Sequence, residues 1–352
     1  MNSMKTWIGK SILIVFVGLT LLGGVVVYID PYFHFHAPLK QFQYPMDNER
    51  YQNDGITRNF AYNAIITGTS MTENFRTSEF DRLFSVNAIK IPFAGAKYKE
   101  INEALQRAIE RNKSIKCIVR SLDGSFLLYD KDMQYRETYP DYLYDKWLIN
   151  DVSYVFNKEV LFGNVRDVID YTYSGQKSPS FDEYMYWADV FTYGRDAILE
   201  HYSRGAKQEL CSLSTEDVER LEANLEQNVI STIKENPQID FYIFFPPYSI
   251  YYWDELYCCG TIKKQLDAEK YTIKKLVSYE NVYMYSFHDE YDMICNPNLY
   301  KDKSHYNADI NSRILQWMSN GEHRLTEENY EDYCERIEQF YMTYDYDGLF
   351  EE

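Results

Sequence analysis

Residues 64–70 read AIITGTS, and this short stretch decides the fold. Its apolar part stops at Gly68, and a serine, Ser70, follows two positions later. A short apolar run that ends at a glycine is typical of a strand buried on both faces of a parallel sheet. Ligands of such sheets bind beyond the carboxyl ends of the strands. We therefore predict that Ser70 lies at the edge where ligands bind.

Working outward, four more short apolar runs follow the first one. They are residues 87–91 (NAIKI), 115–120 (IKCIVR), 240–245 (DFYIFF) and 282–285 (VYMY). Helix-like patterns precede the last three of these runs, at residues 98–112, 215–235 and 261–278. Strands alternating with helices predict an α/β fold, a three-layer parallel sheet of flavodoxin-like type with helices on both faces. A stretch rich in Tyr, Asp and Trp, about residues 125–210, breaks the alternation and is predicted to be an insertion over the ligand edge or a small lid.

An uncharged apolar run of 19 residues, SILIVFVGLTLLGGVVVYI at 11–29, predicts a transmembrane helix. Lys5 and Lys10 precede it and Asp30 follows, which predicts a cytoplasmic tail (residues 1–10), a single-pass anchor in the cell membrane and an extracellular domain. A cleaved signal peptide is the rival interpretation, but the residues after the run contain no A-x-A-like cleavage site.

The rest of the chain is divided by composition. Residues 30–60 form a juxtamembrane segment in which Pro31, Pro38 and Pro45 discourage regular structure. The α/β domain is expected over residues 61–325, and an acidic C-terminal tail over 326–352.

Charge and composition exclude some functions and leave others open. A net charge of -18 argues against nucleic acid as a partner, because phosphate contacts need clustered Lys and Arg. The 35 tyrosines suit either sugar-binding faces or half-buried packing. The six cysteines have no zinc-like spacing; Cys117 is expected in the core, and the adjacent pair Cys258 and Cys259 is a poor candidate for a disulfide.

Two separated motifs carry the chemistry. Ser70 lies in a strand-to-helix turn where backbone N–H groups favour negative charge, although a serine there could equally be a helix N-cap. Residues 298–306 (NLYKDKSHY), after the last strand, place Asp302 three positions before His305. An aspartate can orient a histidine, which in turn takes the proton of a serine hydroxyl. We therefore predict a catalytic triad of Ser70, His305 and Asp302.

With these residues the sequence resembles the SGNH (GDSL-like) hydrolase superfamily, over about residues 60–320. The resemblance is to its membrane-anchored branch, which includes teichoic-acid D-alanylation and alginate O-acetylation proteins. It rests on Ser70, Asp302 and His305, and on Gly95 in residues 93–96 (FAGA). It implies that the N–H groups of Ser70 and Gly95 form an oxyanion hole, and that no cofactor is needed. One departure is Asp123 in residues 121–124 (SLDG), where the superfamily usually has an asparagine that donates to the oxyanion.

Several other residues have two interpretations. Arg58 could bind an anionic group of the substrate or form a surface salt bridge. Tyr248 and its neighbours at 251–253 (YYW) could stack on sugar rings or pack in the core, and Asp123 could bind substrate. His34 and His36 lack further metal ligands nearby, so no metal site is expected. His288, followed by two acidic residues, is expected in a solvated acidic loop.

Together these features predict an esterase or O-acyltransferase of the bacterial cell envelope. Its partners would be a cell-surface or exported glycopolymer, or the acyl donor of that polymer, and a membrane-bound O-acyltransferase. The first alternative is a non-catalytic polymer-binding or assembly subunit that supports such a transferase. The second is a plain extracellular lipase or esterase.

Overall fold

The computed structural model describes residues 2–135 and 140–351. The chain divides into two compact units. The first comprises Met1–Ala61 with Glu137–Ser180, and the second comprises Tyr62–Arg136 with Phe181–Glu352. The stretch expected to be one insertion is thus shared between the two units.

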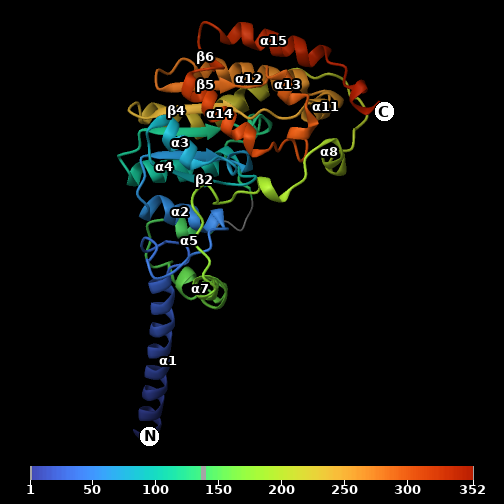
Figure 1. Cartoon of the computed structure of the whole chain (residues 1–352). Helices are drawn as coiled ribbons and strands as arrows, with labels where there is room; N and C mark the ends of the chain where they lie inside the picture. The colour runs from blue at the N-terminus through green and yellow to red at the C-terminus, as the bar shows by residue number, and fades with distance from the viewer. Residues whose placement is uncertain (1, 136–139, 352) are drawn as a thin grey trace. The chain divides into compact units, whose positions relative to one another are not determined.

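The second unit is built on a six-stranded sheet with the order β2-β1-β3-β4-β5-β6 (Figure 1). Its strands are β1 (Ala64–Gly68), β2 (Ala88–Pro92), β3 (Cys117–Ser121), β4 (Asp240–Phe245), β5 (Val282–Ser286) and β6 (Arg324–Leu325). The first five are parallel, and β6 pairs with β5 in the antiparallel direction. This confirms the α/β fold with a flavodoxin-like strand order, to which the two-residue edge strand β6 is added.

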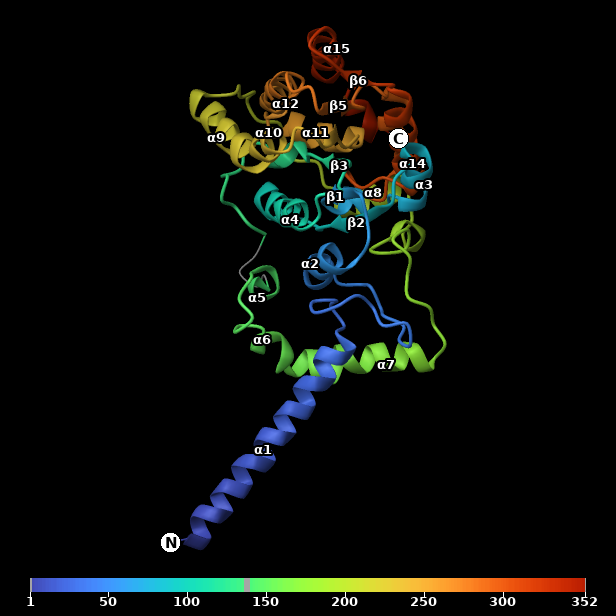
Figure 2. The same cartoon turned by 90° about the vertical axis from the view of Figure 1, so that its left-hand side faces the viewer.

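Helices cover both faces of this sheet (Figure 2). α3 and α14 lie together on one face, and α4, α9, α10 and α12 lie on the other. The helices of this unit are α3 (Thr77–Phe84), α4 (Tyr98–Arg111), α8 (Arg195–His201), α9 (Thr215–Leu225), α10 (Ser231–Glu235), α11 (Ile250–Cys258), α12 (Ile262–Leu276), α13 (Tyr291–Ile294), α14 (Ala308–Asn320) and α15 (Tyr330–Thr343). One π-helical turn, Glu226–Ile230, joins α9 to α10, so the helix predicted at 215–235 is continuous.

The strands β1, β2 and β3 are buried along their whole length, as a sheet covered on both faces requires. Two of the buried side chains are basic. Lys90 of β2 donates to the carbonyl oxygens of Glu73 and Phe75, the latter at 3.0 Å, and burial lowers its pKa to about 7. Arg120 of β3 donates to Asn102 at 3.2 Å, and burial lowers its pKa to about 10.

The C-terminal segment belongs to this unit and is not an extended tail. α15 packs along α12, and Lys263 of α12 pairs with Glu338 of α15 at 3.0 Å. The ring of Tyr341 stacks on Trp253 with centroids 3.9 Å apart. The acidic composition of residues 326–352 predicted a tail. The structure instead has a helix here, and its buried aromatic residues pack against the core.

The first unit contains the long apolar helix α1 (Asn2–Ile29), of which Met4–Ile29 is long and apolar enough to cross a membrane. Its other helical elements are α2 (Glu49–Asn59), α5 (Asp141–Tyr144), α6 (Val152–Val155), the π-helical turn η3 (Val160–Asn164) and α7 (Val165–Tyr173). α2 corrects the expectation of irregular structure through residue 60. The three prolines all precede it, and Gly55 allows close packing, since a Cβ there would lie 2.1 Å from the carbonyl oxygen of Tyr32.

Candidate active site

The turn after β1 presents Ser70 at the carboxyl edge of the sheet. Only glycine fits at Gly68, because a Cβ there would lie 2.0 Å from the Ser121 hydroxyl oxygen. The chain then enters a single 3₁₀ turn, Ser70–Thr72, and the α-helix expected here begins only at Thr77. The Thr69 side chain caps this turn by accepting from the N–H of Met71. The N-cap alternative for Ser70 is therefore wrong.

Ser70, His305 and Asp302 are connected in series. The Ser70 hydroxyl oxygen lies 2.8 Å from Nε2 of His305. On the other side of the ring, Nδ1 of His305 lies 2.8 Å and 3.0 Å from the two carboxylate oxygens of Asp302. The structure thus brings the three predicted residues together although Ser70 and His305 are 235 positions apart.

Asp302 is held as an anion by its own turn. It accepts hydrogen bonds from the backbone N–H groups of Ser304 and His305, each at 2.8 Å. Burial alone would raise the pKa of Asp302, but these bonds and the His305 ring hold that pKa well below its usual range. An ionised carboxylate at this position fixes the imidazole with Nδ1–H toward Asp302 and leaves Nε2 able to accept from Ser70.

The turn that carries Asp302 and His305 is closed on itself and fastened to α11. The Lys301 N–H donates to the carbonyl oxygen of His305 at 3.0 Å, and Tyr300 pairs with Tyr306 in a β-bridge. The Ser249 hydroxyl, at the start of α11, donates to the carbonyl oxygen of Lys303 at 2.7 Å. These bonds explain why an irregular segment can hold a histidine in a fixed position.

The site is accessible from solvent and has an aromatic wall that sequence reasoning missed. The His305 side chain is 27% exposed. The ring of Trp187 meets it edge to face with centroids 5.6 Å apart. The Lys301 ammonium lies over Trp187 and Phe191, at 4.7 Å and 4.0 Å from the ring centroids. No local pattern in residues 187–191 marks them, because they meet the triad only through the tertiary fold.

The second predicted oxyanion donor, Gly95, lies in the turn after the neighbouring strand. Gly68 pairs with Pro92, and the Phe93 N–H donates to the Gly68 carbonyl oxygen at 2.9 Å. Gly95 has φ +67, a left-handed backbone conformation that glycine adopts without strain. Within residues 2–135 and 140–351, neither the Ser70 N–H nor the Gly95 N–H has a hydrogen-bond acceptor. Both donors are therefore available to a ligand.

Asp123 is buried, and both of its carboxylate oxygens have hydroxyl donors. The Thr69 hydroxyl donates to one at 2.9 Å, and the Tyr248 hydroxyl donates to the other. The backbone oxygen of Asp123 accepts from the Tyr98 hydroxyl at 2.9 Å. Burial raises the pKa of Asp123. Through its bond to the Thr69 hydroxyl, Asp123 thus positions the residue that precedes Ser70.

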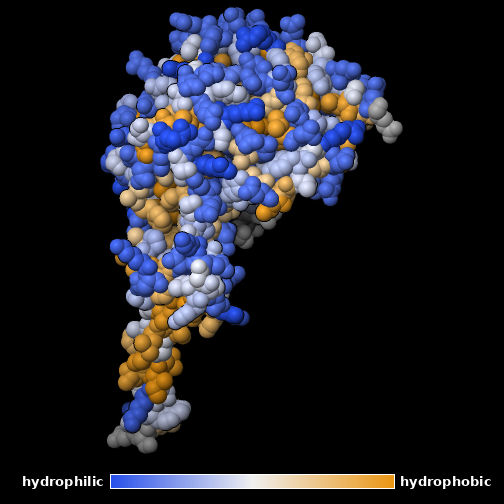
Figure 3. Space-filling view, viewed as in Figure 1, coloured by the Kyte–Doolittle hydropathy of each residue, from blue (hydrophilic) through white to orange (hydrophobic). Residues whose placement is uncertain are grey.

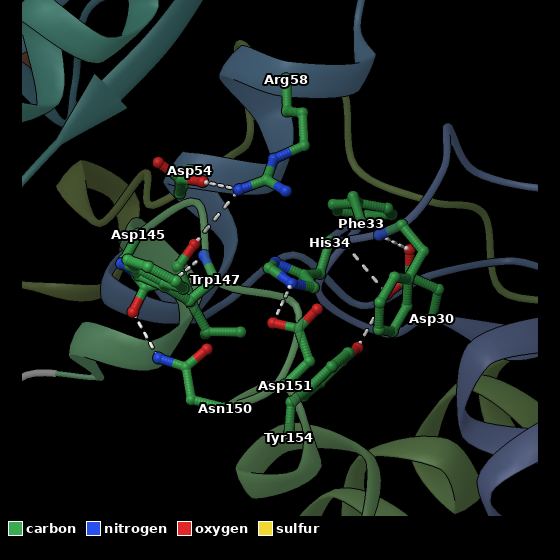
Figure 4. A network of polar contacts seen from close by, with 12 residues as sticks. Asp30, Phe33, His34, Asp54, Arg58, Asp145, Trp147, Asn150, Asp151 and Tyr154 are labelled. Carbon is green, nitrogen blue, oxygen red and sulfur yellow. Dashed lines mark hydrogen bonds and ion pairs between the residues drawn. The ribbon is translucent and has the colours of Figure 1, made fainter.

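Tyr248 and its neighbours pack in the core, so the sugar-stacking interpretation is wrong for them. Tyr248 is 5% exposed, and Tyr251, Tyr252 and Trp253 are also buried. Arg58 belongs to the other unit, where it pairs with Asp54 at 3.0 Å, as the salt-bridge interpretation predicted (Figure 4).

The remaining histidines and cysteines form no metal site in the part of the chain that the structure describes. His34 pairs with Asp151 at 2.9 Å. His288 is 1% exposed, which corrects the expected solvated loop: Glu269 of α12 and the carbonyl oxygen of Pro246 lie at its two ring nitrogens. All six cysteines are free, and Cys117 is buried as expected.

No protein-family model matches the sequence, and no curated protein is significantly similar to it. The chain is therefore characterised by its fold and by the geometry of this site: an α/β unit with a mostly parallel sheet, and a Ser–His–Asp series at its carboxyl edge.

Proposed function

We propose that the protein is a membrane-anchored serine esterase or O-acyltransferase of SGNH type that acts on a cell-surface or exported polysaccharide. The observation that carries the proposal is the connected series of Ser70, His305 and Asp302, with 2.8 Å between successive partners. This is the arrangement that activates a serine hydroxyl for attack on an ester carbonyl.

In the proposed reaction the Ser70 oxygen attacks the ester carbon while Nε2 of His305 takes the hydroxyl proton. The negative charge that develops on the carbonyl oxygen would be stabilised by the N–H groups of Ser70 and Gly95. Collapse of this intermediate expels the alcohol, which receives the proton from His305, and leaves an acyl group on Ser70. Water or a polymer hydroxyl then repeats the sequence in reverse and carries the acyl group away.

The membrane location is supported by the way α1 ends. The side chains of Val26 and Ile29 are buried within the first unit, so the end of the apolar helix is part of a folded structure. A cleaved signal peptide would remove these contacts. Lys5 and Lys10 before the apolar run favour a cytoplasmic N-terminus, which would place both units outside the cell.

The direct test is labelling of the full-length protein by a fluorophosphonate probe, together with an assay of ester cleavage. We expect Ser70→Ala to abolish both labelling and turnover. Ser319→Ala, on the exposed end of α14, is the matched control and should retain both. A Ser70→Ala protein with full activity would refute the proposal.

The second candidate is a non-catalytic assembly subunit that supports a membrane-bound O-acyltransferase. The acidic Asp123 favours it, because it stands where the superfamily usually has a donor and lies one hydrogen bond from the residue before Ser70. In cells, this candidate predicts that gene deletion abolishes polymer acylation while Ser70→Ala and His305→Ala both preserve it. The enzyme proposal predicts that all three change acylation in the same way: it is lost if the protein is an O-acyltransferase and raised if the protein is an esterase.

A further inference from the structure

The first unit exposes a cluster of large apolar side chains next to the anchor helix. We call it the apolar patch: Trp147, Leu148, Ile149, Val152 and Phe156, with exposed fractions from 49% to 82%. The patch occupies the loop between α5 and α6 and continues along α6. Contiguous exposed apolar surface of this kind marks an interaction site.

The position of the patch along α1 can be read from one close contact. At Gly23 of α1, a Cβ would lie 3.0 Å from Val155 and 3.4 Å from Phe156, so the segment that carries the patch packs directly on the helix. Gly23 precedes Ile29 by six residues, which is about 9 Å at the rise of an α-helix. Phe156, the last residue of the patch, therefore lies beside the outer end of the apolar run.

The exposed surface of α1 is apolar along the same stretch (Figure 3). α6 and α7 lie at the C-terminal end of α1, and α7 runs across that end (Figure 2). Through Phe156 the patch thus adjoins the surface that lipid would cover if α1 spans a membrane. This continuity favours lipid over a soluble partner.

Polar contacts inside the first unit join the segment that carries the patch to the residues just after the apolar run (Figure 4). Asp30, the first residue after the apolar run, accepts from the Tyr154 hydroxyl at 2.9 Å. Asp151 pairs with His34 at 2.9 Å. These two residues of the segment, 151 and 154, flank Val152, so the patch is tied to the end of the anchor.

We propose that the apolar patch inserts into the outer leaflet of the membrane as a second lipid contact beside α1. Interfacial segments of this kind bury their apolar side chains about 5–10 Å into the boundary between headgroups and acyl chains. Trp147 would then lie at the level where tryptophan is enriched in membrane proteins. The occupant is a phospholipid surface, and the inference rests on α1 being a membrane anchor.

The test uses the full-length protein in lipid nanodiscs and measures quenching of tryptophan fluorescence by phosphatidylcholine with brominated acyl chains. Trp7→Phe is the background, because it removes the tryptophan of α1 itself. We expect brominated lipid to quench this protein, and Trp147→Phe in the same background to abolish the quenching. Trp317→Phe is the matched control, since Trp317 packs on Phe287 of the second unit and should leave the quenching unchanged.

Equal quenching with and without Trp147, or none in either protein, would overturn the proposal. If each disc holds two chains and Trp147 is not quenched, the patch is a contact between two copies of the chain. This result would also overturn the proposal. Alkaline extraction of native membranes separates this failure from that of the anchor. Release of the wild-type chain refutes the anchor and with it the patch, whereas retention with Trp147 unquenched refutes the patch alone.

Discussion

His288 and His305 both come after strand β5 in the second unit. Each has a carboxylate at one ring nitrogen, and they differ in the group that faces the other ring nitrogen. His305 lies between Asp302 and the hydroxyl of Ser70. His288 lies between Glu269 and the backbone carbonyl of Pro246. A hydroxyl can give up a proton, whereas a carbonyl can only accept one. The pairing with a carboxylate is common to both histidines, so this pairing alone does not make either of them a general base.

The two histidines also differ in how far their side chains are exposed to solvent. The His305 side chain is 27% exposed and can meet a substrate, while His288 is 1% exposed. Burial alone would lower the pKa of His288, but Glu269 and the Pro246 carbonyl raise it above the ordinary value. The pairing of His288 with Glu269 links the end of β5 to α12, and the role of His288 is structural.

The largest effect is expected at His305. His305→Ala should lower kcat by at least about 10⁴-fold, because the general base of the serine is lost. Since the side chain is partly exposed, the midpoint of urea unfolding should stay close to that of the wild type. A His305→Ala protein with a much lower unfolding midpoint but an unchanged kcat would contradict the catalytic role of His305.

His288→Ala should give the opposite pattern. It leaves the buried Glu269 with the Gln265 amide but without its charge partner, which costs about 3–5 kcal/mol of unfolding free energy. Specific activity per folded molecule should be retained. Urea unfolding followed by circular dichroism measures the loss, and His288→Gln, which keeps a donor for the Pro246 carbonyl, should be less destabilised. Equal stability of the wild type and His288→Ala would contradict the structural role.

Asp123 extends the comparison of the two histidines, because it is near the site but is expected to act only by holding Thr69, the residue before Ser70. Asp123→Asn leaves one of the two hydroxyls without its carboxylate acceptor, at a cost of about 1–2 kcal/mol. As Thr69 directly precedes Ser70, the displaced turn should lower kcat about 10-fold to 100-fold with little change in KM. Thr69→Val removes one of the same bonds and should shift kcat in the same direction; an unchanged kcat in both variants would exclude a positioning role.

The smallest expected effect is on the pH dependence of stability. A raised folded-state pKa at His288 means that its contribution is complete below about pH 6.5 and is lost as the pH rises through the folded value. A lowered pKa at Asp302 has the opposite sign: its contribution is present above about pH 4 and is lost as the pH falls below that. The difference in unfolding midpoint between wild type and His288→Gln should therefore shrink from pH 6 to pH 9, whereas a constant difference would contradict the ion pair.

The sequence was sufficient for the five parallel strands and for the placement of Ser70, Asp302 and His305 at one edge, and the antiparallel strand β6 was missed. Short apolar runs ending at Gly68 or Pro92 define strands because a doubly covered sheet tolerates few other patterns. Ser70, Asp302 and His305 could be placed together because the carboxyl ends of parallel strands share one edge.

Features that depend on packing between distant segments were not predictable. Nothing near His288 in the sequence shows that Glu269 and Pro246 enclose it, so its acidic neighbours pointed to solvent instead. For Tyr248 the sequence leaves sugar stacking and core packing open, because tyrosine fits both a cleft and a core. Its burial and its contact with Asp123 decide for the core. The grouping of residues 141–173 with the anchor segment likewise has no signal in local pattern.

Lys90 has a consequence for the heat of unfolding. Burial lowers the pKa of its ammonium to about 7, so near neutral pH part of the folded molecules lack this proton. In the unfolded chain the same amine is fully protonated, and unfolding therefore takes up a fraction of a proton from the buffer. The calorimetric enthalpy measured at pH 7 will consequently include part of the ionisation enthalpy of the buffer, and scans in phosphate and in Tris will differ by that amount.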